Sequence, residues 1–261
     1  MTLEEKAVPS TEERVTPRRH GSYGIDAPFA PAFMAVMAGV VLVTAIISGR
    51  WQQLVPLTFI LFVLGCYLHN SLRGKFVVWA RLLDQLDLRG DERILDLGCG
   101  RGAVLLMAAQ HLTTGRAVGV DLWRRVDQSG NSMEATRRNA IAEGVADRVE
   151  LHTGDMTALP FEDNSFDVIV SSLAVHNIGG GAGRKKAIHE AVRVLRPGGR
   201  LMIADVKATR LYAAQLAKLG MRGVARRRLG WQPWWVVTAT KPGNAVNVSV
   251  EASPTSSIAG V

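Results

Sequence analysis

The sequence predicts an α/β domain around a mostly parallel sheet, with helices on both faces, preceded by a two-helix hairpin that crosses a membrane. Two observations carry this prediction. No formally charged residue stands between Asp26 and Arg50, or between Arg50 and Arg73. From residue 71 to residue 241, helix-like and strand-like patterns alternate, which is typical of parallel strands joined by crossover helices.

The composition is that of a folded chain with a large apolar share. Of 261 residues, 48% are hydrophobic and 21% are charged, and the mean hydropathy is +0.11. These values exclude a disordered or fibrous protein. The two cysteines, Cys66 and Cys99, cannot form a disulfide framework, so we expect a reducing compartment. The net charge of +8 is compatible with nucleic acid, an anionic membrane surface or plain solubility.

The two uncharged stretches are each long enough for a membrane span. Their centres, Phe33–Ile47 and Leu54–Leu68, are apolar almost throughout, and a helix of ~20 such residues crosses a ~30 Å hydrocarbon core. We expect helices over about residues 30–48 and 54–70 within a hairpin at 29–70. Lysines and arginines flank the hairpin at both ends, whereas Arg50 alone lies in its turn. The positive-inside rule therefore places both termini and the domain in the cytoplasm.

Other interpretations of the apolar stretches are open or weaker. A hairpin buried in a protein core has the same all-round apolar pattern and stays an alternative. A signal peptide fits poorly, because a long polar segment precedes the first stretch and a second stretch follows at once.

The remaining segments divide simply. Residues 1–28 are predicted to form a flexible arm, in which Tyr23–Pro28 is a candidate lid, and residues 242–261 a disordered tail. A helical stripe continues out of the hairpin through Phe76, Trp79, Leu83 and Leu86. The expected strands are Arg93–Leu97, Ala117–Asp121, Val149–His152, Asp167–Ser171 and Leu201–Ala204, then an antiparallel pair near Gly223–Leu229 and Trp235–Thr240. The expected helices are Ala103–Leu112, Ser132–Glu143, Lys185–Leu195 and Leu211–Leu219.

The first strand of the domain ends in a glycine motif, Ile94-Leu-Asp-Leu-Gly-Cys-Gly-Arg-Gly102. Its glycines let the backbone approach a ligand closely, and the helix that follows offers free N–H groups. The G-x-G-x-G spacing differs from the G-x-G-x-x-G fingerprint of dinucleotide sites. A nicotinamide-dependent oxidoreductase is disfavoured by this spacing and by the absence of a Tyr-x-x-x-Lys pair.

Acidic residues follow the next two strands at matching positions. Asp121 closes the second strand, where a carboxylate can accept both hydroxyls of a ribose. Asp155 and Met156 follow the third strand, where a carboxylate can accept from an adenine amine and a methionine can pack on the ring.

With these motifs in this order, the segment from about Leu86 to Pro242 resembles the class I S-adenosylmethionine-dependent methyltransferases. It is most similar to the broad group that includes the ubiquinone/menaquinone-biosynthesis C-methyltransferases. The resemblance implies a Rossmann-like, seven-stranded sheet with a final antiparallel hairpin and S-adenosyl-L-methionine as the cofactor, with no metal. It further implies a cofactor site formed by Asp96, Gly98, Gly100, Gly102, Asp121, Leu122, Asp155, Met156 and Ser171.

Three features around this site stay open. His176 follows the fourth strand and is either a catalytic base or a structural histidine. The insertion Trp123–Asn131 is either a solvated loop or part of the substrate wall. Arg226–Arg228 with the nearby tryptophans forms either a charged strand face over core tryptophans or an interfacial surface. Cys99 is interpreted as a small packing residue.

The expected substrate follows from what can cover the site. The connection Ala204–Leu211 is short, and the run Gly179–Gly183 is predicted to be too flexible for a wall. The arm or the hairpin must therefore provide the cover, which suits a small hydrophobic or lipid-like acceptor at a membrane. A cofactor-binding scaffold or sensor without catalysis is the alternative. We expect no nucleic-acid partner, because no separate binding module is present.

Overall fold

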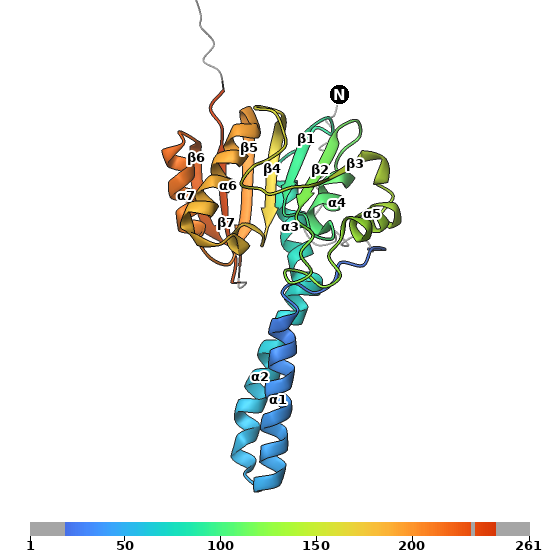
Figure 1. Cartoon of the computed structure of the whole chain (residues 1–261), viewed down its shortest axis with the longest axis vertical. Coiled ribbons are helices and arrows are strands. Elements are labelled where there is room, and N and C mark those ends of the chain that lie inside the picture. Colours follow the sequence, from blue (N-terminus) through green and yellow to red (C-terminus); the bar gives the residue numbers. More distant parts are fainter. Residues whose placement is uncertain (1–18, 231–232, 244–261) are drawn as a thin grey trace, which may run out of the picture.

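The computed structural model describes residues 19–230 and 233–243, and shows a long helical hairpin projecting from an α/β domain (Figure 1). The hairpin consists of α1 (Phe29–Ser48) and α2 (Leu54–His69), joined through a short 3₁₀ turn at Trp51–Gln53. The predicted disordered tail beyond residue 243 and the arm before residue 19 lie outside the described residues.

The hairpin exposes its apolar side chains. Phe59, Phe62 and Ile47 are exposed by 68%, 67% and 81%. The helices Phe29–Ser48 and Trp51–Asp84 are long and apolar enough to cross a membrane, and only 17% and 11% of their most apolar windows are buried. The alternative of a hairpin buried in the core of this domain is therefore wrong.

Helix α2 continues through a π-helical turn, Asn70–Gly74, into α3 (Lys75–Asp84), which packs on the domain. The predicted stripe Phe76, Trp79, Leu83 and Leu86 is at most 3% exposed. The indole nitrogen of Trp79 donates a hydrogen bond to Ser172 Oγ at 2.8 Å. The same continuous helix thus belongs to the exposed hairpin and to the core of the domain.

The domain has a seven-stranded sheet in the order β3-β2-β1-β4-β5-β7-β6, in which β7 runs antiparallel to both of its neighbours. The strands are β1 (Arg93–Leu97), β2 (Arg116–Asp121), β3 (Val149–Thr153), β4 (Phe166–Ser172), β5 (Leu195–Asp205), β6 (Arg222–Arg228) and β7 (Trp235–Thr240). The helices are α4 (Ala103–Gln110), α5 (Met133–Ala142), α6 (Gly180–Val194) and α7 (Thr209–Lys218).

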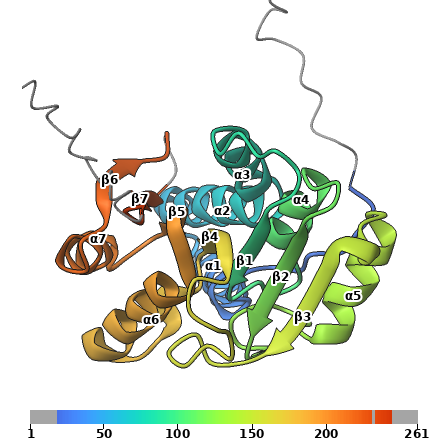
Figure 2. The same ribbon diagram turned by 90° about the horizontal axis from the view of Figure 1, so that it is seen from above.

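Helices cover both faces of the sheet. Figure 2 shows α3, α4 and α5 on one face and α6 and α7 on the other. Each face has its own buried cluster, with Trp79 and Leu105 in the first and Ile188 and Tyr212 in the second. The predicted α/β architecture with a final antiparallel pair is confirmed.

The glycine run Gly179–Gly183 corrects one expectation. Helix α6 begins at Gly180 rather than near Lys185, so the run is the first turn of a helix and not a flexible loop. A Cβ on Gly183 would lie 2.7 Å from Cγ2 of Ile178. The absence of a side chain here lets the preceding segment pack closely against the helix.

The arm corrects a second expectation. Its described part, residues 19–28, packs against the domain. The backbone N–H groups of Gly21 and Ser22 donate to Glu143 Oε1 and Asn139 Oδ1 at the end of α5, both at 2.9 Å. Asp26 forms an isolated antiparallel bridge with Gln128. Side-chain acceptors at the end of α5 thus satisfy the polar backbone of the arm.

The basic and aromatic cluster near the C-terminal strands is a charged strand face beside a core tryptophan. The Arg226 guanidinium stacks on the Trp235 ring at 3.4 Å and donates to Thr209 Oγ1. Trp234 is 4% exposed. Trp231 lies outside the described residues.

Candidate functional site

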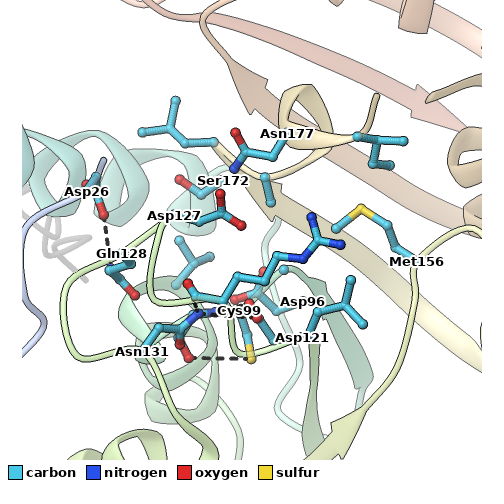
Figure 3. A pocket seen from close by; sticks show the side chains of 18 of the residues that line it. Asp26, Asp96, Cys99, Asp121, Asp127, Gln128, Asn131, Met156, Ser172 and Asn177 are labelled. Carbon is cyan, nitrogen blue, oxygen red and sulfur yellow. Dashed lines mark hydrogen bonds between the residues drawn. The ribbon is translucent and has the colours of Figure 1, made fainter. Parts of the chain in front are cut away.

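A pocket of about 220 Å³ lies beyond the carboxyl ends of β1, β2 and β4. Strand β1 has β2 on one side and β4 on the other, so the chain reverses its winding direction here, which is where α/β sheets form their ligand crevices. Figure 3 shows the pocket with Asp96 and Asp121 on one side and Ser172 and Asn177 on the other. Seven of the predicted cofactor residues line it: Asp96, Gly98, Gly100, Asp121, Leu122, Asp155 and Met156.

The glycine loop forms the floor of the pocket. Gly98 has φ +72°, and a Cβ there would lie 2.3 Å from the Cβ of Ala174. The Gly98 N–H donates to Val120 O and the Gly100 N–H to Asp121 Oδ2, both at 2.8 Å. The loop therefore joins the ends of β1 and β2, and Gly98 and Gly100 line the pocket without a side chain.

Asp96 ends β1 as a buried carboxyl group. It is 1% exposed, and within the described part of the chain its Oδ1 has no hydrogen-bond partner. Burial, and secondly the charge of Asp121, raise the pKa of Asp96 to about 8. A buried carboxyl group with one unpaired oxygen at a pocket is suited to accept from a cationic ligand group, such as an ammonium.

Asp121 and Asp155 are partly occupied by local backbone donors. Asp121 accepts from the N–H groups of Gly100 and Trp123, at 2.8 and 2.6 Å, and from the amide of Asn131 at 3.3 Å. A carboxylate offers about four lone-pair positions, so Asp121 keeps capacity for a ligand hydroxyl. Asp155 accepts from the Thr157 N–H at 2.8 Å. Leu122 is 45% exposed and presents an apolar surface in the pocket.

Two predicted cofactor residues do not line the pocket. Gly102 is the N-cap of α4, with φ 85°. Ser171 is fully buried, and its hydroxyl donates to Leu97 O at 2.8 Å. The neighbouring residues Ser172 and Leu173 line the pocket instead.

His176 also lies outside the lining, although its neighbour Asn177 is part of it. The imidazole Nδ1 is 2.6 Å from Oδ1 of Asp205, which is fully buried at the end of β5. The other oxygen of Asp205 accepts from the His176 N–H at 3.0 Å and from Tyr212 Oη at 3.1 Å. A buried carboxylate thus lies beside this imidazole, although the Nδ1 contact lacks hydrogen-bond geometry.

Asp26 belongs to the candidate lid Tyr23–Pro28 and lines the pocket, whereas Lys75 is a pocket residue that no motif in the sequence indicates. Lys75 Nζ donates to both carboxylate oxygens of Asp26 at 2.9 Å, and Lys75 is 4% exposed. Gln128 Nε2 donates to Asp26 at 3.0 Å, while its Oε1 accepts from the Arg101 N–H at 2.8 Å. This network joins the arm and the base of the hairpin to the glycine loop.

The insertion after β2 forms part of the pocket wall rather than a solvated loop. Arg124, Asp127, Gln128 and Asn131 line the pocket. Backbone hydrogen bonds join the insertion to the arm, from Ala27 N to Asp127 O and from Ser129 N to Ile25 O. Burial raises the pKa of Asp127.

Residues 95–203 match the family model described as a methyltransferase domain. This segment is a class I methyltransferase domain. A ubiquinone/menaquinone biosynthesis C-methyltransferase of Roseobacter denitrificans is 36% identical over 124 residues, which are 48% of this chain and 46% of that protein. The 27-O-demethylrifamycin SV methyltransferase of Amycolatopsis mediterranei is 35% identical over 127 residues, 48% of this chain and 42% of that protein.

Solved structures agree on the fold of the methyltransferase domain. The crystal structure of a SAM-dependent methyltransferase from Aquifex aeolicus superposes with a TM-score of 0.53 at 19% identity, covering 62% of this chain and 88% of that one. The chain spans about half the length of the curated relatives it matches. The hairpin and the arm precede the matched segment.

Proposed function

We propose that this chain is a membrane-anchored methyltransferase that moves a methyl group from S-adenosyl-L-methionine to a small hydrophobic or amphiphilic acceptor. One observation carries the proposal. The pocket formed by the glycine loop is also walled by Asp26 and Lys75, which stand at the base of the exposed apolar hairpin. The site therefore lies next to the base of the hairpin, whose helices project from the domain in Figure 1.

The residues of the pocket fit S-adenosylmethionine, which supplies a methyl group bound to a positively charged sulfur. The unpaired carboxyl of Asp96 suits the ammonium of the methionine part, and Asp121 suits the ribose hydroxyls. Leu122 and Met156 offer apolar surface to the adenine, with Asp155 as an acceptor beside them. The protein's contribution is to bind, orient and exclude water, because methyl transfer is an in-line displacement.

The opposite wall suits an acceptor with a polar head. It combines the polar side chains of Asn177, Arg124 and Asp127 with the apolar Ile178 and Leu173. An isoprenoid quinone has this character, and the Roseobacter relative is named for ubiquinone and menaquinone biosynthesis. The hairpin would hold the domain at the membrane, with both termini and the catalytic domain in the cytoplasm.

His176 is the proposed general base for an acceptor that loses a proton. Asp205 lies beside the Nδ1 side of the ring, which leaves Nε2 as the atom that would receive the proton. Asp205 acts here as a positioning residue.

Two measurements test this proposal. The full-length chain is expected to float with phosphatidylcholine liposomes after an alkaline carbonate wash. Its release by the wash would contradict the membrane insertion of the hairpin. Calorimetric titration of the detergent-solubilised chain is expected to show binding of S-adenosylmethionine and not of NAD. Asp121→Ala should weaken this binding, whereas Asp147→Ala, at an exposed surface carboxylate, should not. Binding without any methyl transfer to membrane extracts would favour the scaffold alternative.

A further inference from the structure

A second cavity lies at the base of the hairpin, separate from the methyltransferase pocket. Its volume is about 740 Å³, and we call it the root cavity. One side is the arm, from Arg19 to Ile25, and the other is the segment from His69 to Val77, where α2 passes into α3. The two cavities share no lining residue.

The root cavity is lined by cationic side chains and by no carboxylate. Arg19 and Arg73 both face it, together with His69. Neither guanidinium forms an ion pair with a carboxylate among residues 19–230 and 233–243. The charge of Glu143 acts on Arg19, but Glu143 Oε1 already accepts from Gly21 N and Tyr23 Oη. Lys75, on the same helix, is paired with Asp26 in the other pocket.

Arg19 is held in a fixed place on the cavity wall. Its guanidinium lies 3.4 Å from the centre of the Phe76 ring, an arrangement that leaves the N–H donors at the edge of the plane available to an anion. Burial lowers the pKa of Arg19, and a bound anion would offset that cost.

The position of the cavity favours an anionic group that belongs to a lipid. His69 is the last residue of α2, so the cavity begins where the apolar stretch of the candidate span ends. Leu72 and Val77, exposed by 50% and 38%, line it beside the cations. Cations next to exposed apolar side chains at the end of a candidate membrane span match a phosphate group that carries acyl chains more closely than they match a free phosphate ion.

We propose that the root cavity binds the headgroup of an anionic phospholipid, with Arg19 and Arg73 on its phosphate and Leu72 and Val77 along its glycerol and first acyl carbons. The proposal rests on the membrane insertion of the hairpin. The bound lipid would join the arm to the base of the hairpin. It would thereby fix the height of the domain above the membrane.

Native mass spectrometry of the full-length, detergent-solubilised chain tests this site. The probe is phosphatidylglycerol in competition with phosphatidylcholine of the same acyl chains. We expect one phosphatidylglycerol to be retained with about thirtyfold preference, because two arginines at ~1 kcal/mol each near an anionic lipid surface contribute ~2 kcal/mol. Arg19→Gln with Arg73→Gln should abolish the preference. Arg50→Gln, at the far turn of the hairpin, should leave it unchanged.

Each outcome separates the lipid site from its alternatives. Equal retention of both lipids, or a preference that survives the double variant, would overturn the proposal. Displacement of phosphatidylglycerol by low concentrations of inorganic phosphate would also overturn it, because the ligand would then be the free ion. Failure of the chain to float with any liposome would instead contradict the membrane insertion of the hairpin. The failure of the lipid site and the failure of the proposed membrane anchor are therefore distinguishable. Circular dichroism of the double variant checks that its fold is intact.

Discussion

The carboxyl group of Asp96 is buried, so water cannot solvate its charge in the folded protein. Its pKa is raised from 3.8 to about 8. Between these values the folded chain keeps a proton that the unfolded chain has lost, so the free energy of unfolding falls as the pH rises through this window. Above about 8 both states are ionised and this contribution stops changing.

We therefore predict that Asp96→Asn makes stability less dependent on pH. An amide is isosteric and stays neutral, so the variant should lose less stability between two pH values inside the window than the natural chain does. Urea unfolding midpoints of both proteins at each pH provide the measurement. An equal loss in both proteins would show that Asp96 does not hold the proton.

His176 is predicted to affect turnover and not cofactor binding. If the imidazole accepts the acceptor's proton, His176→Gln should lower kcat by about 10²-fold, the lower range for general-base catalysis. The affinity for S-adenosylmethionine should stay unchanged, because His176 is not one of the residues proposed to hold the cofactor. The matched control is His189→Gln, at a side chain that is 59% exposed. An unchanged kcat would leave His176 a structural residue.

At the scale of elements, the strand ends and the part of the chain that borders the site were predictable, but the residue pair that forms this border was not. Asp96, Asp121 and Asp155 follow consecutive strands, and parallel strands bring their carboxyl ends to one edge of the sheet. The side-chain pattern therefore placed them together without any knowledge of tertiary packing.

Asp26 and Lys75 carry no such local signal. They lie on either side of the hairpin in the sequence and meet only because α1 and α2 fold back on each other. The sequence pattern also did not predict that α6 begins at Gly180. Glycine disfavours a helix by ~1 kcal/mol per residue, and only the close approach of Ile178 explains the choice of Gly183. His176 comes after the fourth strand, as expected from the sequence. Its side chain lies beside Asp205 of β5, the neighbouring strand of the sheet, and no local pattern indicates this contact.

The Asp26–Lys75 pair is predicted to hold the arm on the base of the hairpin. Lys75→Met leaves the Asp26 carboxylate without its cation in a mostly buried place, which should cost about 2–4 kcal/mol, near the range for broken buried pairs. Arg81→Met, at an exposed position of α3, should change stability by about 0.5 kcal/mol or less. Chemical unfolding of both variants gives the comparison. The addition of Asp26→Asn to Lys75→Met should restore part of the loss, and no restoration would contradict the role given to the pair.

At the scale of the whole molecule, one continuous structure runs from the apolar hairpin to the glycine loop. Helix α3 continues α2 and packs in the core of the domain, and Lys75, Asp26 and Gln128 extend the connection to Arg101 by hydrogen bonds. The methyltransferase pocket therefore has a fixed place relative to the hairpin. An acceptor dissolved in the bilayer would approach the pocket along the base of the hairpin.

The most direct test of this account is methyl transfer by the full-length chain in liposomes that contain an extract of membrane lipids. S-adenosylmethionine with a labelled methyl group is supplied from the aqueous side, and the lipids are then extracted with organic solvent. We predict label in the organic phase, lost with Asp121→Ala and kept with Asp147→Ala. Label confined to water-soluble products, or none at all from a chain that binds the cofactor, would contradict the central claim.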